Sequence, residues 1–305
     1  MRLLISGVSG LLGVNLALVA CQDDRVSGVV HRTPLKTDRF QVIQADLSQA
    51  GEIEKLMNTV QPDWIINCAA LANLEACETN PRLAERLNAD LPSRLAAYVA
   101  RGGARLLQIS TDAVFDGQRG NYREEDEPHP LSVYAQTKLA GERAVLELAP
   151  QSLVVRVNFF GWSISGTRSL AEFFYNNLKA GKKVAGFTDI YFCPLLVNDL
   201  AQILLNLIST KKSGLYHVAA PQAISKYEFG IGIAQRFGFD EQLIQPASLE
   251  QAQFKAPRSP MMTLATEKIQ SELATPLPAI ETELDRFRDL WSQGYPDQLH
   301  QMGAG

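Results

Sequence analysis

The chain opens with the stretch Arg2-Leu3-Leu4-Ile5-Ser6-Gly7-Val8-Ser9-Gly10-Leu11-Leu12-Gly13, which decides its fold. A short apolar strand runs into a glycine-rich turn, and an apolar segment reaching Cys21 continues as a helix. Gly7 lets the chain turn sharply, Gly10 leaves room for a pyrophosphate, and Gly13 lets helix and strand pack closely. The helix N-terminus attracts phosphates.

The spacing is G-x-x-G-x-x-G, because Ser9 stands where dinucleotide-binding turns usually carry their second glycine. Glycines at this density also occur in ordinary loops, so the strand–turn–helix context carries the interpretation. It predicts that a dinucleotide is bound by Gly7, Ser9, Gly10, Leu11, Leu12 and Gly13.

The composition is that of an ordinary globular protein. The 305 residues are 46% hydrophobic and 20% charged, which allows one or two domains with a large core. A net charge of −4 gives no electrostatic footprint for nucleic acid. No apolar run is long enough for a membrane span, and the N-terminus does not resemble a signal peptide, so we expect a cytoplasmic protein.

The cysteines and histidines give no metal-binding pattern. Cys21, Cys68, Cys77 and Cys193 show no C-x-x-C spacing, and the four histidines are far apart in sequence. We therefore predict reduced, mostly buried thiols and no metal site.

Strand-like and helix-like stretches alternate along the first half of the chain. Further strands are predicted at residues 26–31, 41–44, 63–67, 105–110 and 153–157. Helices are predicted at 52–59 and 83–100, the second announced by Asn80 before Pro81. The alternation predicts a Rossmann-like, doubly wound α/β fold with a parallel sheet, whose ligands bind at the carboxyl ends of the strands.

The residues after the second strand indicate which cofactor is used. An NAD site usually offers an acidic residue there, but no acid lies between Asp24 and Asp38. Arg32, beside His31, could instead pair with a 2′-phosphate. We therefore predict NADPH, with NADH possible; the alternative is that Arg32 is a solvated loop charge and both cofactors are used.

Two further strand ends are candidates for cofactor contacts. Asp46 and Leu47 could reach the adenine, although an Asp here could equally be the N-cap of a helix. After the fourth strand, Cys68, Ala69 and Ala70 are small enough for a cofactor to lie against the backbone, although packing alone also favours small residues at such positions.

The candidate catalytic residues are Thr111, at the end of the fifth strand, with Tyr134 and Lys138, which share a helix face. This set suits carbonyl reduction: the phenol gives a proton to the alkoxide, the lysine lowers the phenol pKa, and Thr111 hydrogen-bonds the oxygen. The alternative is an ordinary helix pair. A second such pair, Tyr175 and Lys179, lacks a suitable strand end, and we expect it on a helix surface.

Taken together, these motifs resemble those of the extended short-chain dehydrogenase/reductase superfamily. The likeness extends from Met1 to about Trp291 and includes Asn67–Ala70, Ser110–Gly117 and Gly141-Glu142. Within the superfamily, Thr111–Gly117, Gly214–His217 and Pro257–Pro260 most resemble dTDP-4-dehydrorhamnose reductases.

The resemblance implies a Thr111–Tyr134–Lys138 triad, NADPH or NADH, and a nucleoside-diphosphate 4-keto-6-deoxy sugar as substrate. Similar 4,6-dehydratases carry an Asp-Glu pair after the threonine, whereas here Ala113 follows Asp112, which favours simple reduction. The reductases usually have Tyr at the position of Ala113 and a Trp closer to the sixth strand than Trp162, so the sugar pocket differs. The predicted substrate-binding residues are Asp112, Ala113, Asn158 and Arg258.

The second half of the chain is expected to form the substrate-binding part of the protein. Amphipathic helices are predicted at 169–179 and 197–208, and Ser225 and Glu228 form a capping box that opens a helix through Phe237. Residues 189–194 are expected to be partly extended; in relatives this region contacts the nucleotide sugar, but an ordinary buried strand fits as well. Arg258 is a candidate for the substrate diphosphate, with a solvated loop arginine as the alternative.

We expect a dinucleotide-binding unit from residues 1–157 plus about 190–218, and a smaller, discontinuous substrate-binding unit from about 158–189 and 219–292. A final helix is predicted at 277–291, and 293–305 is expected to be a tail that is disordered from His300 onward.

Three functions fit this sequence. The first is an NADPH-preferring reductase of a nucleotide sugar. The second is a regulatory partner without catalysis, because the regulatory β subunit of methionine adenosyltransferase resembles the same reductases. The third is an epimerase with tightly held cofactor. The sugar, the nucleotide base and the oligomeric state, including a homodimer, stay open.

Overall fold

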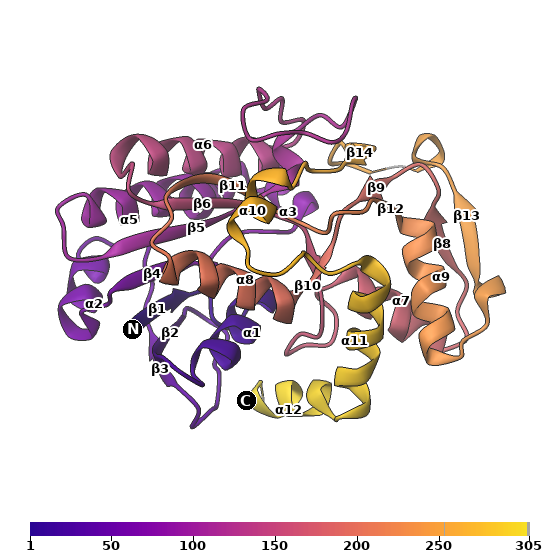
Figure 1. The fold of residues 1–305 in the computed structure, drawn as a ribbon, viewed down its shortest axis with the longest axis horizontal. Helices are drawn as coiled ribbons and strands as arrows, with labels where there is room; N and C mark the ends of the chain where they lie inside the picture. The colour runs from indigo at the N-terminus through magenta and orange to yellow at the C-terminus, as the bar shows by residue number, and fades with distance from the viewer. Residues whose placement is uncertain (253, 304–305) are drawn as a thin grey trace.

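The computed structural model describes residues 1–252 and 254–303. Its main sheet has seven strands, all paired in parallel, in the order β11-β6-β5-β4-β1-β2-β3 (Figure 1). The strands are β1 (Arg2–Ser6), β2 (Arg25–Val30), β3 (Gln41–Gln44), β4 (Trp64–Asn67), β5 (Arg105–Thr111), β6 (Leu153–Val157) and β11 (Gly214–Val218). This architecture confirms the doubly wound α/β fold predicted from the alternating pattern.

The order of the strands reverses beside β1. From β1 the chain continues outward to β2 and β3, then crosses back to place β4 on the other side of β1. A doubly wound sheet opens a crevice at such a reversal, beyond the carboxyl ends of the strands. The glycine-rich turn follows β1 at this point, and Asn67 ends β4 next to it, with the Ser6 hydroxyl donating to the Asn67 side chain at 2.5 Å.

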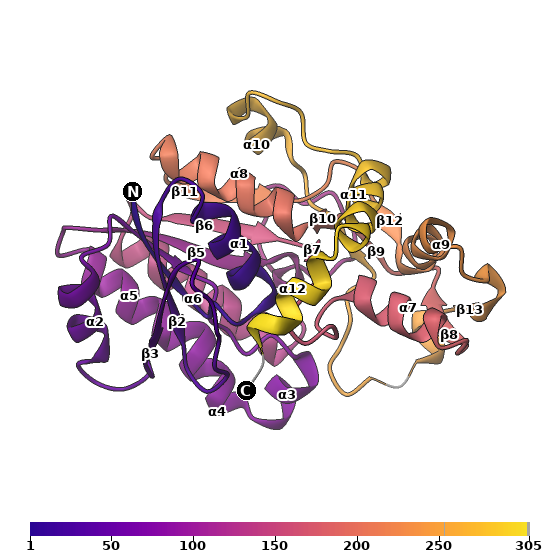
Figure 2. The ribbon, with the colours of Figure 1, turned by 90° about the horizontal axis from the view of Figure 1, so that it is seen from below.

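Helices cover both faces of the sheet (Figure 1, Figure 2). Helices α1 (Leu11–Ala20) and α8 (Val197–Ser209) lie on one face; α2 (Glu52–Val60), α5 (Leu91–Val99) and α6 (Val133–Leu148) lie on the other. Successive residues of β1 serve the two layers, because Leu3 and Ile5 are buried with α1 while Leu4 is buried with α2 and α5. A strand buried on both faces reads as a continuous apolar run, as observed here.

The helix predicted at 83–100 is interrupted. The chain forms α3 (Leu74–Thr79), α4 (Pro81–Glu85), a π-helical turn (Arg86–Asp90) and then α5. Asn80 caps α4 as predicted, accepting from the Leu83 N–H at 3.1 Å. Pro92 has no N–H to donate to the Asn88 carbonyl four residues earlier. That carbonyl packs instead against α6, where a Cβ on Gly141 would lie 2.1 Å from its oxygen.

The second half of the chain builds smaller sheets beside the main one. Two-stranded pairs join β7 (Phe159–Phe160) to β10 (Leu195–Leu196) and β8 (Val184–Phe187) to β13 (Ile244–Ala247), and β9 (Tyr191–Phe192) lies between β12 (Ile224–Ser225) and β14 (Met261–Met262). The helices of this half are α7 (Leu170–Lys179), α9 (Lys226–Phe237), α10 (Glu267–Glu272), α11 (Ile280–Ser292) and α12 (Tyr295–Met302). The predicted division into two units stays a prediction.

An aromatic cluster fills the space between α7, α9 and α11. Trp162 stacks on Phe287 with ring centroids 4.1 Å apart, and Tyr175 meets Trp162 edge-on at 5.1 Å and Phe237 at 4.8 Å. The prediction that Tyr175 and Lys179 form a surface pair is therefore wrong for Tyr175, whose ring is buried. Its helix face turns toward α9 and α11, whose positions a local pattern does not disclose.

The tail predicted from residue 293 is also wrong over most of its length. Tyr295–Met302 form α12, Leu299 is fully buried, and the Met302 carbonyl accepts from the Lys36 N–H at 2.8 Å. Residues 304–305 lie outside the described part. Within the described ranges, no helix combines the length and apolar character that crossing a membrane requires.

Candidate active site

The glycine-rich turn has the geometry that its sequence predicts. Gly7 has φ +66°, and a Cβ there would lie 2.8 Å from the Ala69 backbone. A Cβ on Gly13 would lie 2.4 Å from the Gly7 carbonyl oxygen, which shows how closely α1 packs on the turn. Both glycines are therefore required by the backbone path itself.

The start of α1 offers free donors. Gly10 is its N-cap and provides no side-chain hydrogen bond, and its Ser9 neighbour donates or accepts none in the described part of the chain. The Gly10 N–H donates to the Gly7 carbonyl at 2.9 Å, and the next N–H that bonds back to the turn is that of Val14, to the Gly10 carbonyl at 3.1 Å. The N–H groups of Leu11, Leu12 and Gly13 have no acceptor among the described residues. Such unpaired donors at a helix N-terminus fit a pyrophosphate.

At the ends of β2 and β3, His31 and Asp46 face each other, with the imidazole Nε2 3.5 Å from the carboxylate. Asp46 accepts from the Ser48 N–H at 3.0 Å and from its hydroxyl at 2.7 Å, and mainly this hydroxyl lowers the Asp46 pKa to about 2. Helix α2 begins after Gly51, so the alternative that Asp46 caps a helix is wrong.

The remaining cofactor candidates line the same edge of the sheet. Arg32 is exposed and makes no ion pair within residues 1–252 and 254–303, whereas the Leu47 side chain is buried. After β4, burial raises the pKa of the Cys68 thiol to about 12, and Ala69 carries the backbone that abuts Gly7. Ala70 follows on the surface.

The three candidate catalytic residues come together from β5 and α6. Thr111 ends β5, and Ser132 caps α6 by accepting from the Ala135 N–H at 3.3 Å. This start places Tyr134 and Lys138 one turn apart on the face toward β5. The Lys138 ammonium donates to the Ile109 carbonyl at 2.5 Å and is buried.

Burial dominates the ionisation of both side chains. It raises the pKa of Tyr134 to about 12, an effect that the neighbouring Thr111 side chain only partly opposes. It lowers the pKa of Lys138 to about 8, although Glu142 acts in the opposite direction. The prediction that Lys138 lowers the phenol pKa is therefore wrong for this structure, because the ammonium is directed at the main chain of β5.

Asp112, the residue after Thr111, lies in a polar cluster. The Thr111 hydroxyl donates to one carboxylate oxygen at 3.0 Å, and the Asn158 amide donates to the other. Burial raises the pKa of Asp112 to about 6. Ala113 lies next to it in a short 3₁₀ turn (Asp112–Val114) and is partly exposed. Three of the four predicted substrate residues thus lie beside the candidate catalytic threonine.

The fourth predicted residue, Arg258, is partly buried and paired rather than solvated. Its guanidinium donates to Glu75 at 3.1 Å and lies 4.8 Å from the centroid of the Phe254 ring, with one-fifth of the side chain exposed. The alternative of a solvated loop arginine is wrong.

Lys226 is a charged residue near the site that the sequence reasoning missed. It is the first residue of α9 and lies between Ser225 and Glu228, which form the capping box as predicted. Burial and the neighbouring Arg258 lower the Lys226 pKa, while Asp112 opposes them, so the three charges lie within reach of one another. The sequence signal that could have pointed to Lys226 was the capping box, because it fixes where α9 begins, after β12.

Within the described residues, no group of three or more His, Cys, Asp or Glu side chains is arranged to hold a metal ion. The fold and the side chains together define a Rossmann-like protein with a dinucleotide turn at one strand end and a Thr–Tyr–Lys set at another. The family model described as the RmlD substrate binding domain matches residues 1–291, and the chain belongs to this family.

Relatives in sequence carry more than one name. A dTDP-4-dehydrorhamnose reductase of Mycobacterium tuberculosis is 33% identical over 305 residues, covering 93% of this chain and 96% of the relative. A probable low-salt glycan biosynthesis reductase of Haloferax volcanii is 32% identical over 285 residues, covering 92% and 95%. The methionine adenosyltransferase 2 subunit beta of Xenopus laevis is 31% identical over 260 residues, covering 82% and 76%.

Solved structures agree with the family. A dTDP-4-dehydrorhamnose reductase of Clostridium acetobutylicum superposes with a TM-score of 0.82 at 27% identity, covering 96% of this chain and all of that one. The Bacillus anthracis enzyme of the same name, solved in complex with NADP, gives 0.81 at 25% identity, covering 94% and 98%. The resemblance to these reductases inferred from sequence motifs is confirmed.

Proposed function

We propose that this protein is an NADPH-preferring reductase of a nucleotide-diphosphate-linked 4-keto-6-deoxy sugar. The observation that carries the proposal is the meeting of Thr111, from the end of β5, with Tyr134, from the face of α6, beside the Asp112 cluster. A hydroxyl and a protonated phenol next to each other suit a carbonyl oxygen that gains negative charge.

The free N–H groups of Leu11–Gly13 support a dinucleotide at the start of α1, and exposed Arg32 at the end of β2 would bind a 2′-phosphate. His31, Asp46 and Leu47 would border the adenine, and Cys68, Ala69 and Ala70 the backbone beside the cofactor. When bound there, NADPH supplies the hydride that a ketone carbon accepts.

The side chains of this protein supply the proton and the orientation. With its pKa at about 12, the Tyr134 phenol keeps its proton at neutral pH and is ready to give it to the substrate oxygen. Thr111 would orient that oxygen once its hydroxyl, whose single proton is donated to Asp112 at 3.0 Å, turns that proton toward the substrate. Lys138, whose ammonium donates to the Ile109 carbonyl, would hold the nicotinamide ribose.

Asp112, Ala113 and Asn158 would contact the sugar, and Arg258 its diphosphate. A partly buried guanidinium that, among the described residues, bonds one oxygen of Glu75 retains further N–H donors for a phosphate.

The test is loss of the reduced nicotinamide absorbance when the protein meets NADPH and enzymatically generated dTDP-4-dehydro-L-rhamnose. We expect turnover in the wild type and a fall of about 10²–10⁴-fold in Tyr134→Phe, because the proton donor is lost. NADPH affinity, measured by fluorescence titration, should not change. The same assay with NADH measures the cofactor preference.

The chain offers a matched control in its second Tyr-x-x-x-Lys pair. Tyr175 lies in the aromatic cluster, away from Thr111, so Tyr175→Phe should turn over normally. Normal turnover in Tyr134→Phe would show that another group gives the proton.

A regulatory role is the second candidate, and the relative named methionine adenosyltransferase 2 subunit beta favours it. NADPH binding without oxidation by any of a panel of nucleotide keto sugars would point to that role.

A further inference from the structure

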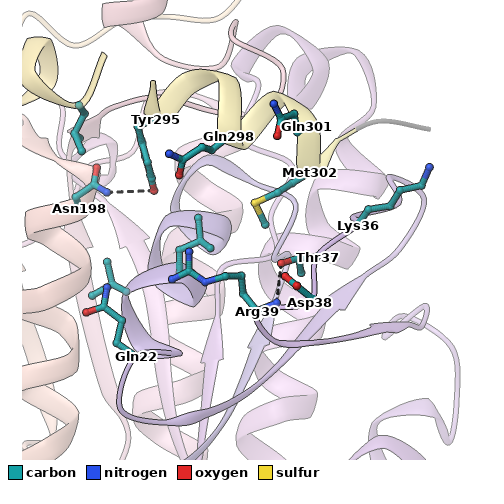
Figure 3. Close-up of a pocket in the computed structure, with 13 residues that line it drawn as sticks. Gln22, Lys36, Thr37, Asp38, Arg39, Asn198, Tyr295, Gln298, Gln301 and Met302 are labelled. Carbon is teal, nitrogen blue, oxygen red and sulfur yellow. Dashed lines mark hydrogen bonds between the residues drawn. The ribbon is translucent and has the colours of Figure 1, made fainter. Parts of the chain in front are cut away.

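A cavity of about 540 Å³ lies between α1, the connection from β2 to β3, and α12 (Figure 3). It touches the last turn of α1 at Leu18 and Val19 and the turn after this helix at Gln22, whereas the dinucleotide turn is at the opposite end of the helix. None of Thr111, Tyr134 and Lys138 lines it. Its volume is within the range of about 300–1,000 Å³ that is typical of small-molecule sites.

The pocket has one apolar side and several carboxamides. Leu18 and Val19 of α1, Leu290 of α11 and Met302 of α12 give apolar contact. Amide side chains come from the turn after α1, from α8 and from α12: Gln22, Asn198, Gln298 and Gln301. Each amide offers both a donor and an acceptor, so together they suit the edge of a planar, polar ring whose face rests on the apolar side.

The charge in the pocket is mainly positive. Arg39 extends from the β2–β3 connection into the cavity, and Lys36 stands at its rim (Figure 3). Asp38 is the one acid among the described residues that line it. Arg39 makes no ion pair in the described part of the chain. Burial raises the pKa of Tyr295 to about 12, and the nearby Arg39 guanidinium only partly opposes this shift. A planar guanidinium without a carboxylate partner is suited to a phosphate.

The walls of the pocket are held by a hydrogen-bond network. The Tyr295 hydroxyl donates to the Asn15 side-chain oxygen at 2.7 Å and accepts from the Asn198 amide at 3.3 Å. The Lys36 N–H donates to the Met302 carbonyl at 2.8 Å, which ties the β2–β3 connection to α12. The cavity is therefore formed before any ligand arrives, so ligand binding need not order its walls.

We propose that this pocket is a second nucleotide site, distinct from the dinucleotide site, which binds a nucleoside monophosphate. The base lies on the apolar side among the carboxamides, and the phosphate lies against Arg39.

The test is calorimetric titration of the full-length protein with AMP and, separately, with adenosine. Saturating NADPH and dTDP are present in both titrations, so that the proposed cofactor and substrate sites are filled. We expect AMP to bind about tenfold more tightly than adenosine or better, because the phosphate forms charge-assisted hydrogen bonds. Arg39→Gln should remove this advantage and leave adenosine binding unchanged.

Arg101→Gln, which changes an exposed arginine outside the pocket, is the matched control and should bind AMP like the wild type. AMP binding that Arg39→Gln leaves intact would overturn the proposal, because it would place the nucleotide elsewhere. Absence of AMP binding at millimolar concentration, or equal affinity for AMP and adenosine, would also overturn it.

Discussion

At the scale of single residues, burial acts on Tyr134 and Lys138 in opposite directions. A buried phenol favours its neutral, protonated form, and a buried ammonium favours its neutral, deprotonated form. With pKa values of about 12 and about 8, the phenol keeps its proton across the neutral range while the lysine loses its own at mildly alkaline pH. The pair is thus fully protonated only below pH 8.

This difference predicts the pH dependence of the proposed reaction. If the Lys138 cation assists Tyr134, kcat/KM should fall as pH rises through about 8, the pKa of Lys138 in the free enzyme. Lys138→Arg should keep its charge and move the fall to higher pH, at lower overall activity. An unchanged pH profile in that variant would assign the fall to another group.

Glu283 of α11 is a further residue whose ionisation matters, here for the stability of the fold. Its carboxyl is fully buried, and neither of its oxygens, nor Oδ2 of Asp199, has a partner among the described residues. Burial, together with the neighbouring Asp199, raises the Glu283 pKa far above its ordinary value. A proton on Glu283 supplies the donor that the Asp199 oxygen otherwise lacks.

The stability effect follows from the direction of this shift. The folded protein holds a proton on Glu283 that the unfolded chain releases above pH of about 4.5. Its contribution to stability is therefore complete below that pH and is lost progressively as pH rises toward the folded pKa. Glu283→Gln is neutral at every pH, so its stability relative to the wild type should rise from pH 5 to pH 9.

Urea denaturation at these two pH values measures the difference. A relative stability of the variant that stays constant with pH would mean that Glu283 is ionised in the fold.

At the scale of elements, two glycines at the start of α1 are needed for different reasons. Gly13 must lack a Cβ because the Gly7 carbonyl is in its place. Gly10 has ordinary backbone angles, and a Cβ there would lie 3.1 Å from the same carbonyl, a much milder contact. Gly13 is therefore required for packing, whereas Gly10 leaves room for a ligand to approach.

This contrast predicts different losses. Gly13→Ala should destabilise the fold by about 1–3 kcal/mol, as overpacking does. Gly10→Ala should keep nearly the stability of the wild type but weaken NADPH binding by about tenfold or more, because a methyl group would face the pyrophosphate. Thermal unfolding and NADPH titration of both variants check the assignment, which equal stability losses would contradict.

Elements with local signals were predictable. The strands at 41–44 and 153–157 and the capping box of α9 agree with the structure because strand apolarity and capping act within a few residues. The break between α4 and α5 had a local signal that the prediction missed, because Pro92 lies inside the predicted helix and cannot donate to the Asn88 carbonyl. The packing of that carbonyl against Gly141, far along the chain, left no local signal.

At the scale of the whole molecule, a buried ion pair joins α6 to the main sheet. Arg156 of β6 and Glu142 of α6 are each 2% exposed, and Ser110 of β5 donates to the same carboxylate at 2.7 Å. Neutral His217 of β11, whose pKa burial lowers to about 3, lies 3.2 Å from the guanidinium. Side chains from β5, β6 and β11 thus form one cluster with Glu142 of α6, the helix that carries Tyr134 and Lys138.

Removing one partner leaves a buried charge without compensation. Arg156→Met should cost about 3–5 kcal/mol of unfolding free energy, and the double variant Arg156→Met, Glu142→Met should recover most of that loss. Urea denaturation of the single and double variants measures both values. A double variant as unstable as the single one would show that the pair itself, rather than the uncompensated charge, supplies the stability.

Contacts at this scale are where sequence reasoning fell short. The Thr111, Tyr134 and Lys138 set could be predicted, because Thr111 lies at the end of an apolar strand and the other two are spaced to share a helix face. Lys226, the burial of Tyr175 and the folded α12 depend on packing between segments far apart in the chain, which leaves no local pattern.

The order of synthesis gives the Asn15 network a further meaning. Asn15 emerges from the ribosome 280 residues before Tyr295, which donates to its side chain. A nascent chain can therefore complete every strand of the main sheet before α12 has been made, and this flank closes only afterwards. Translation that stopped between β11 and α12 would yield a protein with all strands of the main sheet and an open flank, which cellular quality control would meet as an unfinished product.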